Sequence, residues 1–211
     1  MRALLTGFGP FPGVAFNPTA VLVEALARRR RPALSAIERT GHVFATVYAA
    51  VDRDLPGLFA QKPDVVLMFG LASRTNFLRI EARARNSRSV LFADAGGHRP
   101  QRAVIRTGAP TELRTAAPSA RLLATARRAG GVAARLSRDA GRYLCNYAYW
   151  RALERAGHGR GNGPLVIFVH IPPVRPASRP LQPTRARALS LPRLIAVAEK
   201  LLLTLIAASR R

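Results

Sequence analysis

The sequence predicts an α/β fold with three layers, α/β/α, in which helices cover both faces of a twisted, mostly parallel open sheet. Two segments, residues 65–69 and 165–170, carry this prediction. The first is a continuous apolar run and the second is apolar as far as its final His170, and such runs are typical of strands buried on both faces of a parallel sheet. They alternate with segments of helical spacing, which is typical of the α/β class. We find no internal repeat and no linker, so we expect one domain over residues 1–211.

The first half of the chain predicts a β-loop-α unit followed by two further strands. Residues 3–6 form a short apolar run that Gly7 ends, and a loop rich in glycine and proline follows as far as Pro18. Residues 19–31 then carry apolar side chains at helical spacing. The later elements expected here are a strand at 42–47, a short helix at 51–61 and a central strand at 65–69.

The second half of the chain begins with an irregular stretch. Beyond Glu81 no periodicity is evident, and residues 83–106 predict an excursion over the surface. The elements expected after it are a helix at 119–128, a short strand at 132–136, a helix over about 145–155, a buried strand at 165–170 and an amphipathic helix at 191–208. These elements complete the alternation of strands and helices.

Side chains with useful chemistry follow the ends of the buried strands. In open α/β sheets, ligands bind outside the carboxyl ends of the strands. Glu81 comes after the third strand, His170 ends the last one, and Cys145 begins a helix on the same side in this arrangement. A carboxylate, a thiol and an imidazole can therefore converge at one edge of the sheet.

Cys145 is the only cysteine of the chain, so it cannot form an internal disulfide. A free cysteine is most often a small, buried apolar side chain. A thiol at the start of a helix, however, faces free backbone N–H groups and the positive end of the helix dipole, which favour the thiolate. Core packing and a nucleophilic role are both open at this point.

The net charge of the chain is +23, and nearly all of the excess is arginine, because Lys62 and Lys200 are the only lysines. Such a charge suits an acidic partner such as nucleic acid, but the arginines are scattered and no recognised nucleic-acid module accompanies them. We therefore expect only weak, nonspecific association with nucleic acid. No apolar run approaches the ~20 residues of a membrane span. An unpaired thiol stays reduced in the cytoplasm, which is the expected location.

Three segments, in the same order, carry a resemblance to a known family. They are residues 5–11 with residues 17–19 shortly after, residues 137–146 around Cys145, and residues 169–172 around His170. Over nearly the whole chain, the sequence resembles the pyroglutamyl-peptidase I family (pyrrolidone-carboxyl peptidases), cysteine peptidases that remove an N-terminal pyroglutamyl residue. Glu81 matches the acidic residue of that family.

The resemblance implies a mechanism that the chemistry of these residues supports. His170 takes the proton of Cys145, the thiolate attacks the pyroglutamyl carbonyl to form an acyl-enzyme, and His170 protonates the departing amine. Glu81 accepts a hydrogen bond from the far imidazole nitrogen and fixes its tautomer. No metal and no cofactor is implied. The implied partners are small peptides with an N-terminal pyroglutamate and further copies of the chain in a tetramer.

The resemblance also implies an apolar pocket for the pyrrolidone ring. Phe8 and Phe11 flank the flat ring in this prediction, and Tyr143 and Leu144 line the opposite side. Two other interpretations of this loop are plain core packing of the two phenylalanines and a phosphate cradle between the first strand and the first helix. The glycine spacing and the prolines of the loop, which lack N–H donors, argue against the cradle.

Two departures from the family pattern lie near the substrate. Leu71 stands where the family commonly has glutamine, and Leu91 stands where it usually carries an arginine close to the oxyanion site. Both changes remove polar groups, so a divergent member with altered or lost pyroglutamyl specificity is the first alternative function. Arg85 or Arg88 would supply the lost charge only if the loop has shifted.

Each member of the proposed triad also has an ordinary structural interpretation. A histidine that ends an apolar strand is most often a satisfied core or surface group. Glu81 lies among Arg79, Arg83 and Arg85, which suggests a surface ion pair. If the triad interpretation does not hold, the second alternative function is that of a basic protein which uses the same fold to associate with nucleic acid. The three matching segments together favour the peptidase.

Overall fold

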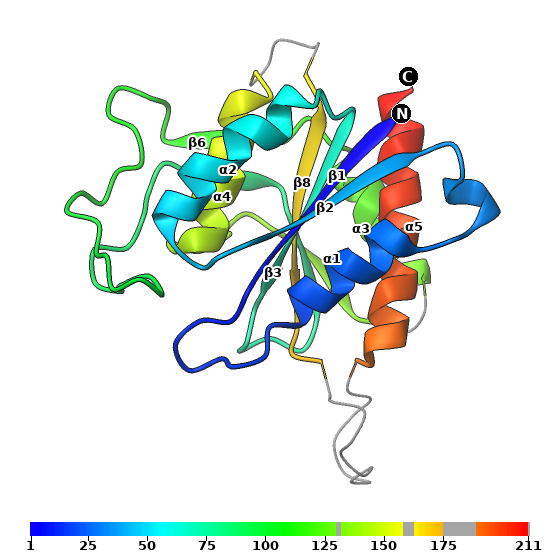
Figure 1. Ribbon diagram of the computed structural model, residues 1–211, viewed down its shortest axis with the longest axis horizontal. Coiled ribbons are helices and arrows are strands. Elements are labelled where there is room, and N and C mark those ends of the chain that lie inside the picture. The colour runs from blue at the N-terminus through cyan, green and yellow to red at the C-terminus, as the bar shows by residue number, and fades with distance from the viewer. Residues whose placement is uncertain (130–131, 158–162, 175–188, 211) are drawn as a thin grey trace, which may run out of the picture.

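A computed structural model describes residues 1–129, 132–157, 163–174 and 189–210. A six-stranded sheet forms the middle layer, and helices cover both of its faces (Figure 1). The helices on one face are α1, Pro18–Arg28, α3, Ser119–Arg128, and α5, Leu191–Ser209, and those on the other are α2, Tyr48–Ala60, and α4, Leu144–Arg155. The predicted α/β/α architecture is confirmed.

The sheet has the strand order β2-β1-β3-β8-β4-β7. Its strands are β1, Arg2–Phe8, β2, Glu38–Phe44, β3, Val65–Leu71, β4, Leu78–Glu81, β7, Ala134–Ser137, and β8, Leu165–Ile171. The first four strands in this order are parallel, whereas β4 runs antiparallel to β8 and parallel to β7. The sheet is therefore mostly parallel, as predicted, and β4 and β7 form a reversed wing at one edge.

The central strands β3 and β8 are buried along nearly their whole length. Leu67 and Ile167 enter the apolar cluster under α1, α3 and α5, while Met68 and Phe168 enter the cluster under α2 and α4. Because helices cover both faces, every position of these strands can be apolar, which explains the continuous runs in the sequence. Within the described residues, no helix has the length and apolar content needed to cross a membrane.

The loop after β1 closes tightly against the start of α1. Asn17 caps the helix by accepting a hydrogen bond from the Thr19 N–H, and Pro18 occupies an early helical position. The Thr19 hydroxyl accepts from the backbone N–H of Phe8 and donates to its carbonyl. A Cβ added to Gly7 would lie 2.8 Å from the Thr19 carbonyl oxygen, so this close approach requires glycine.

The structure differs from the predicted elements mainly between residues 78 and 114. Glu81 ends the strand β4 instead of lying in a loop after the third strand. The segment expected to be irregular begins with β5, Arg83–Arg85, which pairs with β6, Glu112–Arg114, in a two-stranded sheet. These strands have four residues or fewer and carry several arginines. A run so short shows no apolar alternation, so local pattern does not predict it.

Candidate active site

The strand register places four side chains of β4 and β8 on one face of the sheet. Arg79 lies opposite His170, and Glu81 lies opposite Phe168. Opposite residues of paired strands point to the same face, as do residues two apart on one strand. Since Phe168 belongs to the apolar cluster under α2 and α4, the other three side chains also face this layer.

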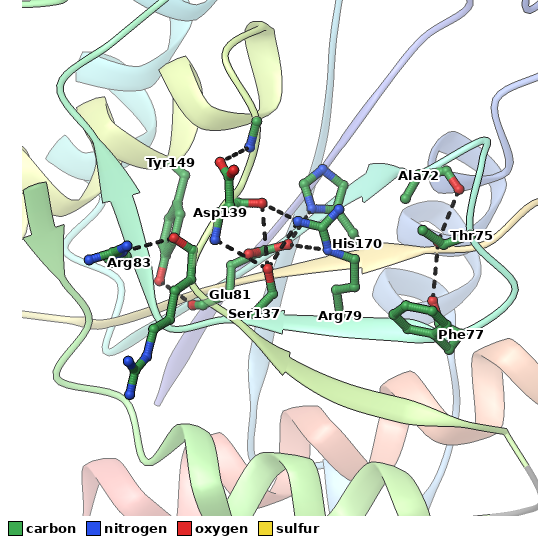
Figure 2. Close-up of polar contacts among 12 residues, drawn as sticks. Ala72, Thr75, Phe77, Arg79, Glu81, Arg83, Ser137, Asp139, Tyr149 and His170 are labelled. Atoms are coloured by element: carbon green, nitrogen blue, oxygen red, sulfur yellow. Dashed lines mark hydrogen bonds and ion pairs between the residues drawn. The ribbon is translucent and has the colours of Figure 1, made fainter.

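Glu81 and His170 form a buried pair across these two strands. Oε1 of Glu81 lies 2.8 Å from Nδ1 of His170 (Figure 2). Glu81 is completely buried and His170 nearly so. Because an ionised carboxylate can only accept, the proton of this hydrogen bond belongs to Nδ1. In the neutral imidazole, Nε2 is then left free to accept a proton.

Cys145 lies in the first turn of α4, which begins at Leu144. Its Sγ reaches the sheet at Gly70, because a Cβ added to that glycine would lie 2.7 Å from the sulfur. Gly70 is the register partner of His170 on the neighbouring strand β3. The thiol therefore sits over the edge where these two strands end. The positive end of the α4 dipole, which stabilises an anion, points to the same place.

The His170 imidazole holds its proton more tightly than an ordinary histidine. Burial lowers the pKa of His170, but hydrogen bonds to Cys145 and Glu81, together with the negative charges of both groups, raise it from 6.5 to about 9. At neutral pH the imidazolium is therefore favoured when its two partners are anionic. A thiolate next to an imidazolium is the reactive form of a nucleophilic cysteine.

Asn146, directly after Cys145, ties the start of α4 to β5. Its side-chain amide accepts a hydrogen bond from the Arg85 N–H and donates to the carbonyls of Arg85 and Ser87, each at 2.8 Å. The side chain is completely buried, so these bonds hold the first turn of α4 in place. We did not predict this role from the sequence; the available signal is a single amide among the aromatic residues of α4.

Arg79 is a second residue whose place the sequence did not reveal. Its Nε lies 3.1 Å from Oε1 of Glu81. The ordinary alternative for Glu81 was a surface ion pair with a neighbouring arginine, but the carboxylate is completely buried. The available signal was their separation of two residues, which puts both side chains on one face once β4 is known to be a strand.

The residues predicted to line the substrate pocket differ in burial. Phe8 and Leu144 are buried in the apolar cluster under α2 and α4, where Tyr143 and Cys145 are partly buried members. Phe11 lies half-buried in the loop after β1, outside this cluster. The structure thus brings three of the four residues into one cluster with the thiol, and their contact with a substrate stays a prediction.

The two leucines that depart from the family pattern lie in different settings. Leu71 ends β3 opposite Ile171. Leu91 is 73% exposed, in a loop that Tyr143 holds through a 2.9 Å hydrogen bond from its hydroxyl to the carbonyl of Ala93. The two departures that the resemblance implies thus lie beside the thiol-bearing edge and in the loop next to it.

The two arginines considered as replacements for the lost charge make other contacts. Nε of Arg88 donates to the carbonyl of Arg102 at 3.0 Å. The guanidinium of Arg85 lies 3.8 Å from the Asp139 carboxylate. A shift of the loop that would bring either side chain to an oxyanion stays a prediction.

A buried imidazole that bonds to a carboxylate and lies beside a thiol is typical of hydrolases that form an acyl-enzyme on cysteine. Here it is built at the carboxyl edge of an open α/β sheet, where such folds place their ligands. Within the described residues, no three His, Cys, Asp or Glu side chains gather in a way that could hold a metal ion. Fold and site together define the class of cysteine-dependent hydrolases.

The chain belongs to the pyroglutamyl peptidase family, whose sequence model matches residues 1–198. A pyrrolidone-carboxylate peptidase of Vibrio vulnificus is 33% identical over 175 residues, covering 81% of this chain and 78% of the relative. Another, of Gloeobacter violaceus, is 31% identical over 173 residues, covering 82% of each protein. The family of cysteine peptidases suggested by the three sequence segments is therefore confirmed.

Solved structures with these names share the fold. A mutant pyrrolidone carboxyl peptidase of Pyrococcus furiosus superimposes with a TM-score of 0.85 over 99% of this chain and 100% of its own, at 23% identity. Pyroglutamyl peptidase I of Bacillus amyloliquefaciens gives a TM-score of 0.82 at 24% identity, over 99% and 98% of the two chains. The arrangement of strands and helices described above is thus that of the family.

Proposed function

We propose that this chain hydrolyses the amide bond after an N-terminal pyroglutamyl residue, with Cys145 as the nucleophile and His170 as the general acid and base. Glu81 orients His170. The observation that carries the proposal is the buried imidazole of His170, which hydrogen-bonds to Glu81 and lies on the strand next to Gly70, where the Cys145 thiol sits. Membership of the pyroglutamyl peptidase family supports the substrate class.

Acylation begins with a proton transfer from the Cys145 thiol to Nε2 of His170. The thiolate attacks the pyroglutamyl carbonyl carbon, and the electron pair of the carbonyl moves to its oxygen to give a tetrahedral oxyanion. When the oxyanion collapses, the C–N bond breaks and the imidazolium gives its proton to the departing amine. The products of this half-reaction are a shortened peptide and a thioester on Cys145.

Deacylation uses the same groups in reverse order. The neutral imidazole of His170 accepts a proton from water, and the resulting hydroxide attacks the thioester carbonyl. The second tetrahedral intermediate expels the thiolate, which the imidazolium then stabilises. Free pyroglutamate leaves, and Glu81 keeps Nδ1 protonated throughout, so that Nε2 always faces the reaction.

The backbone N–H groups at the start of α4 are the natural donors to the oxyanion. The first N–H groups of a helix have no intrahelical partner, and Cys145 lies within the first turn. A donor of this kind is worth about 2.7–4 kcal/mol in the transition state. The uncharged lactam suits the aromatic walls that Phe8, Phe11 and Tyr143 supply, with Leu144 beside them.

The proposal extends to the setting of the enzyme. We infer that residues 1–211 form one catalytic domain, and that a nucleophilic thiol of this kind works in the reducing cytoplasm. A homotetramer is the assembly that the resemblance implies. Light scattering after gel filtration measures this assembly, and the charge of +23 makes its dependence on salt informative.

The decisive experiment compares wild type with Cys145→Ala on a chromogenic pyroglutamyl amide. We expect wild type to release the chromophore and the alanine variant to lose at least ~1,000-fold in rate, because the covalent step is removed. The matched control substrate is the prolyl amide, which keeps the five-membered ring but lacks the lactam carbonyl. No release from several pyroglutamyl amides, or an active alanine variant, would refute the proposal.

The two alternatives have distinct signatures in the same preparation. Alkylation of Cys145 at neutral pH without release of pyroglutamate would indicate a divergent family member. Salt-dependent binding to nucleic acid that survives loss of the thiol would indicate a binding protein. The family match supports the peptidase over both.

A further inference from the structure

Arg79 makes three polar contacts that join two parts of the active site (Figure 2). Its Nε lies 3.1 Å from Oε1 of Glu81. Its Nη2 donates to Oγ of Ser137 at 2.9 Å and to the backbone carbonyl of Asp139. One guanidinium thus binds the carboxylate that orients His170 and, at the same time, the segment that follows β7.

This segment is the approach to the nucleophile. β7 ends at Ser137, which is the register partner of Glu81. From there the chain runs through a turn, in which the Asp139 carboxylate accepts the Gly141 N–H at 3.1 Å, to the first turn of α4. By holding Ser137 and Asp139 to Glu81, Arg79 fixes the approach to Cys145 relative to the carboxylate.

The charge of Arg79 also offsets the free-energy cost of burying the Glu81 carboxylate. Glu81 is completely buried, and within the described residues its Oε2 has no hydrogen-bond partner. A buried carboxylate with so few partners is costly unless a cation pairs with it. Oε1 therefore pairs with two cationic groups at once, the imidazole of His170, which donates through Nδ1–H, and the guanidinium of Arg79, whose Nε forms an ion pair with it.

We propose that Arg79 is a positioning residue of the catalytic site, which holds Glu81 in register with the approach to Cys145 and moderates the pull of Glu81 on the His170 imidazolium. This inference rests on the proposed function. Arg79 touches neither substrate nor thiol and acts through Glu81. A lysine cannot replace it fully, because it lacks the planar fork of the guanidinium. This fork lets Nε pair with Glu81 while Nη2 donates to two other partners.

The elements packed around Arg79 and Glu81 carry several other charged or titratable groups. They are Cys145 and Tyr149 from α4, Arg83 from β5, Arg135 from β7 and Asp139 from the turn after β7. The hydroxyl of Tyr149 donates to the backbone carbonyl of Glu81 at 2.8 Å, and burial raises its pKa, so it stays neutral in the range considered. The guanidinium of Arg135 stacks on the ring of Phe77. Only Arg79 forms an ion pair with Glu81 besides His170 among the described residues.

The sign of the charge effect follows from electrostatics. Replacing Arg79 by methionine removes a positive charge near the thiol and the imidazole, so the thiolate is less stabilised and the imidazolium is less repelled. Both changes favour the protonated thiol and the protonated imidazole over their deprotonated forms. We therefore expect the acid limb and the alkaline limb of the pH profile to move upward together, by roughly half a unit to one unit.

The protonation state of the thiol can be followed directly, because Cys145 is the only cysteine of the chain. The rate of alkylation by iodoacetamide, measured from pH 4 to pH 10, reports the thiolate without any need for peptidase turnover. We expect the profile of Arg79→Met to lie higher in pH than that of wild type, and the profile of Arg79→Lys to coincide with wild type. The lysine variant should still lose roughly tenfold in kcat on the pyroglutamyl amide at unchanged KM, because the fork is lost.

Arg83→Met is the matched control. The Arg83 side chain is 23% exposed, against 24% for Arg79, and it also pairs with a carboxylate, that of Glu112. It has the same charge on the next strand but no contact with Glu81, so its alkylation profile should match wild type. If Arg79→Met does not fold, as judged by circular dichroism, Arg79→Gln replaces it with a polar side chain of no charge.

The outcomes separate this inference from the proposed function. An alkylation profile of Arg79→Met or Arg79→Gln that overlays wild type, or that Arg83→Met reproduces, overturns the role of Arg79. Full kcat in Arg79→Lys overturns the requirement for the fork. The proposed function fails separately, if wild type alkylates at Cys145 but releases no pyroglutamate, and the profiles still decide the charge effect in that case.

Discussion

The Cys145 thiol fills the space that a side chain at position 70 would occupy. A Cβ on Gly70 would lie 2.7 Å from Sγ of Cys145 and equally close to the Phe168 ring. The Cβ atoms of real proteins essentially never approach another heavy atom this closely, so any side chain at position 70 has to displace the thiol or the ring. Glycine here is a requirement of the active site and not of the backbone conformation.

Gly70→Ala should therefore inactivate the enzyme. We expect kcat/KM on a pyroglutamyl amide to fall at least ~100-fold, since the nucleophile moves by about the width of the clash, and the unfolding free energy to fall by about 1–3 kcal/mol from overpacking. Gly57→Ala is the control, because among the described residues no atom outside the neighbouring backbone of α2 itself lies within 4 Å of an added Cβ. It should keep full activity and gain about 0.4–1 kcal/mol. Normal activity in Gly70→Ala would contradict the placement of the thiol.

The imidazolium of His170 should make stability depend on pH. The pKa of His170 is raised to about 9 in the folded state from 6.5, so its contribution is complete below pH 6.5 and is lost as the pH rises through 9. In Glu81→Gln the imidazolium loses one anionic partner. Between pH 6.5 and pH 10, wild type should lose about 1–2 kcal/mol more unfolding free energy than this variant. Urea titrations at both pH values measure the difference, and parallel pH curves would show that Glu81 does not hold the proton.

Asn146→Ala should damage both stability and turnover. The substitution leaves the N–H of Arg85 and two carbonyls without their buried partner, which costs about 2–4 kcal/mol. Because Asn146 anchors the first turn of α4, kcat should also fall at least ~10-fold. Asn86 is a comparable buried amide, with bonds to the backbone of Ile105, Arg106 and Ala109. Asn86→Ala should lose similar stability and keep kcat within about twofold; equal losses of kcat would show a general effect of destabilisation.

Tyr143→Phe should weaken substrate binding more than catalysis. The lost hydroxyl holds the carbonyl of Ala93 in the loop beside the predicted pocket, so KM should rise by roughly 3- to 10-fold with little change in kcat. Tyr143 precedes α4 as its N-cap, and the control is Tyr147→Phe in the first turns of that helix, whose hydroxyl bonds to Asp52 at 2.7 Å. Steady-state kinetics on one pyroglutamyl amide distinguishes the two, and equal KM values would remove Tyr143 and its loop from the pocket.

The sequence predicted the parts of this fold that depend on local pattern. Apolar runs in the sequence predict the buried strands β3 and β8, and α4 lies where the helix of Cys145 was predicted. Cys145 and His170 could therefore be placed at the correct ends of their elements. Family resemblance singled out Glu81, because its own segment has no apolar periodicity.

The remaining features depend on contacts between distant segments. β4 exists because it pairs with β8 and β7, and the antiparallel register with β8 is what brings Arg79 opposite His170. The bonds of Asn146 reach across about sixty residues of sequence to β5. The sequence does not show which distant segments pair, and the spacing of Arg79 and Glu81 gains meaning only once β4 is known to be a strand, so three-dimensional structure is needed to reveal these supports of the site.

The reversed wing of β4 and β7 is a region of low local stability, which a measurement of global unfolding alone would not detect. Glu81 is carried by a strand with a single, four-residue neighbour on its outer side, whereas His170 belongs to the central strand β8. Fraying of sheet edges takes less free energy than global unfolding. On heating, the enzyme should therefore lose activity at a lower temperature than that of global unfolding. Local unfolding of β7 and β4 would remove the Glu81 carboxylate from the site, while Cys145 and His170 remain in the folded core.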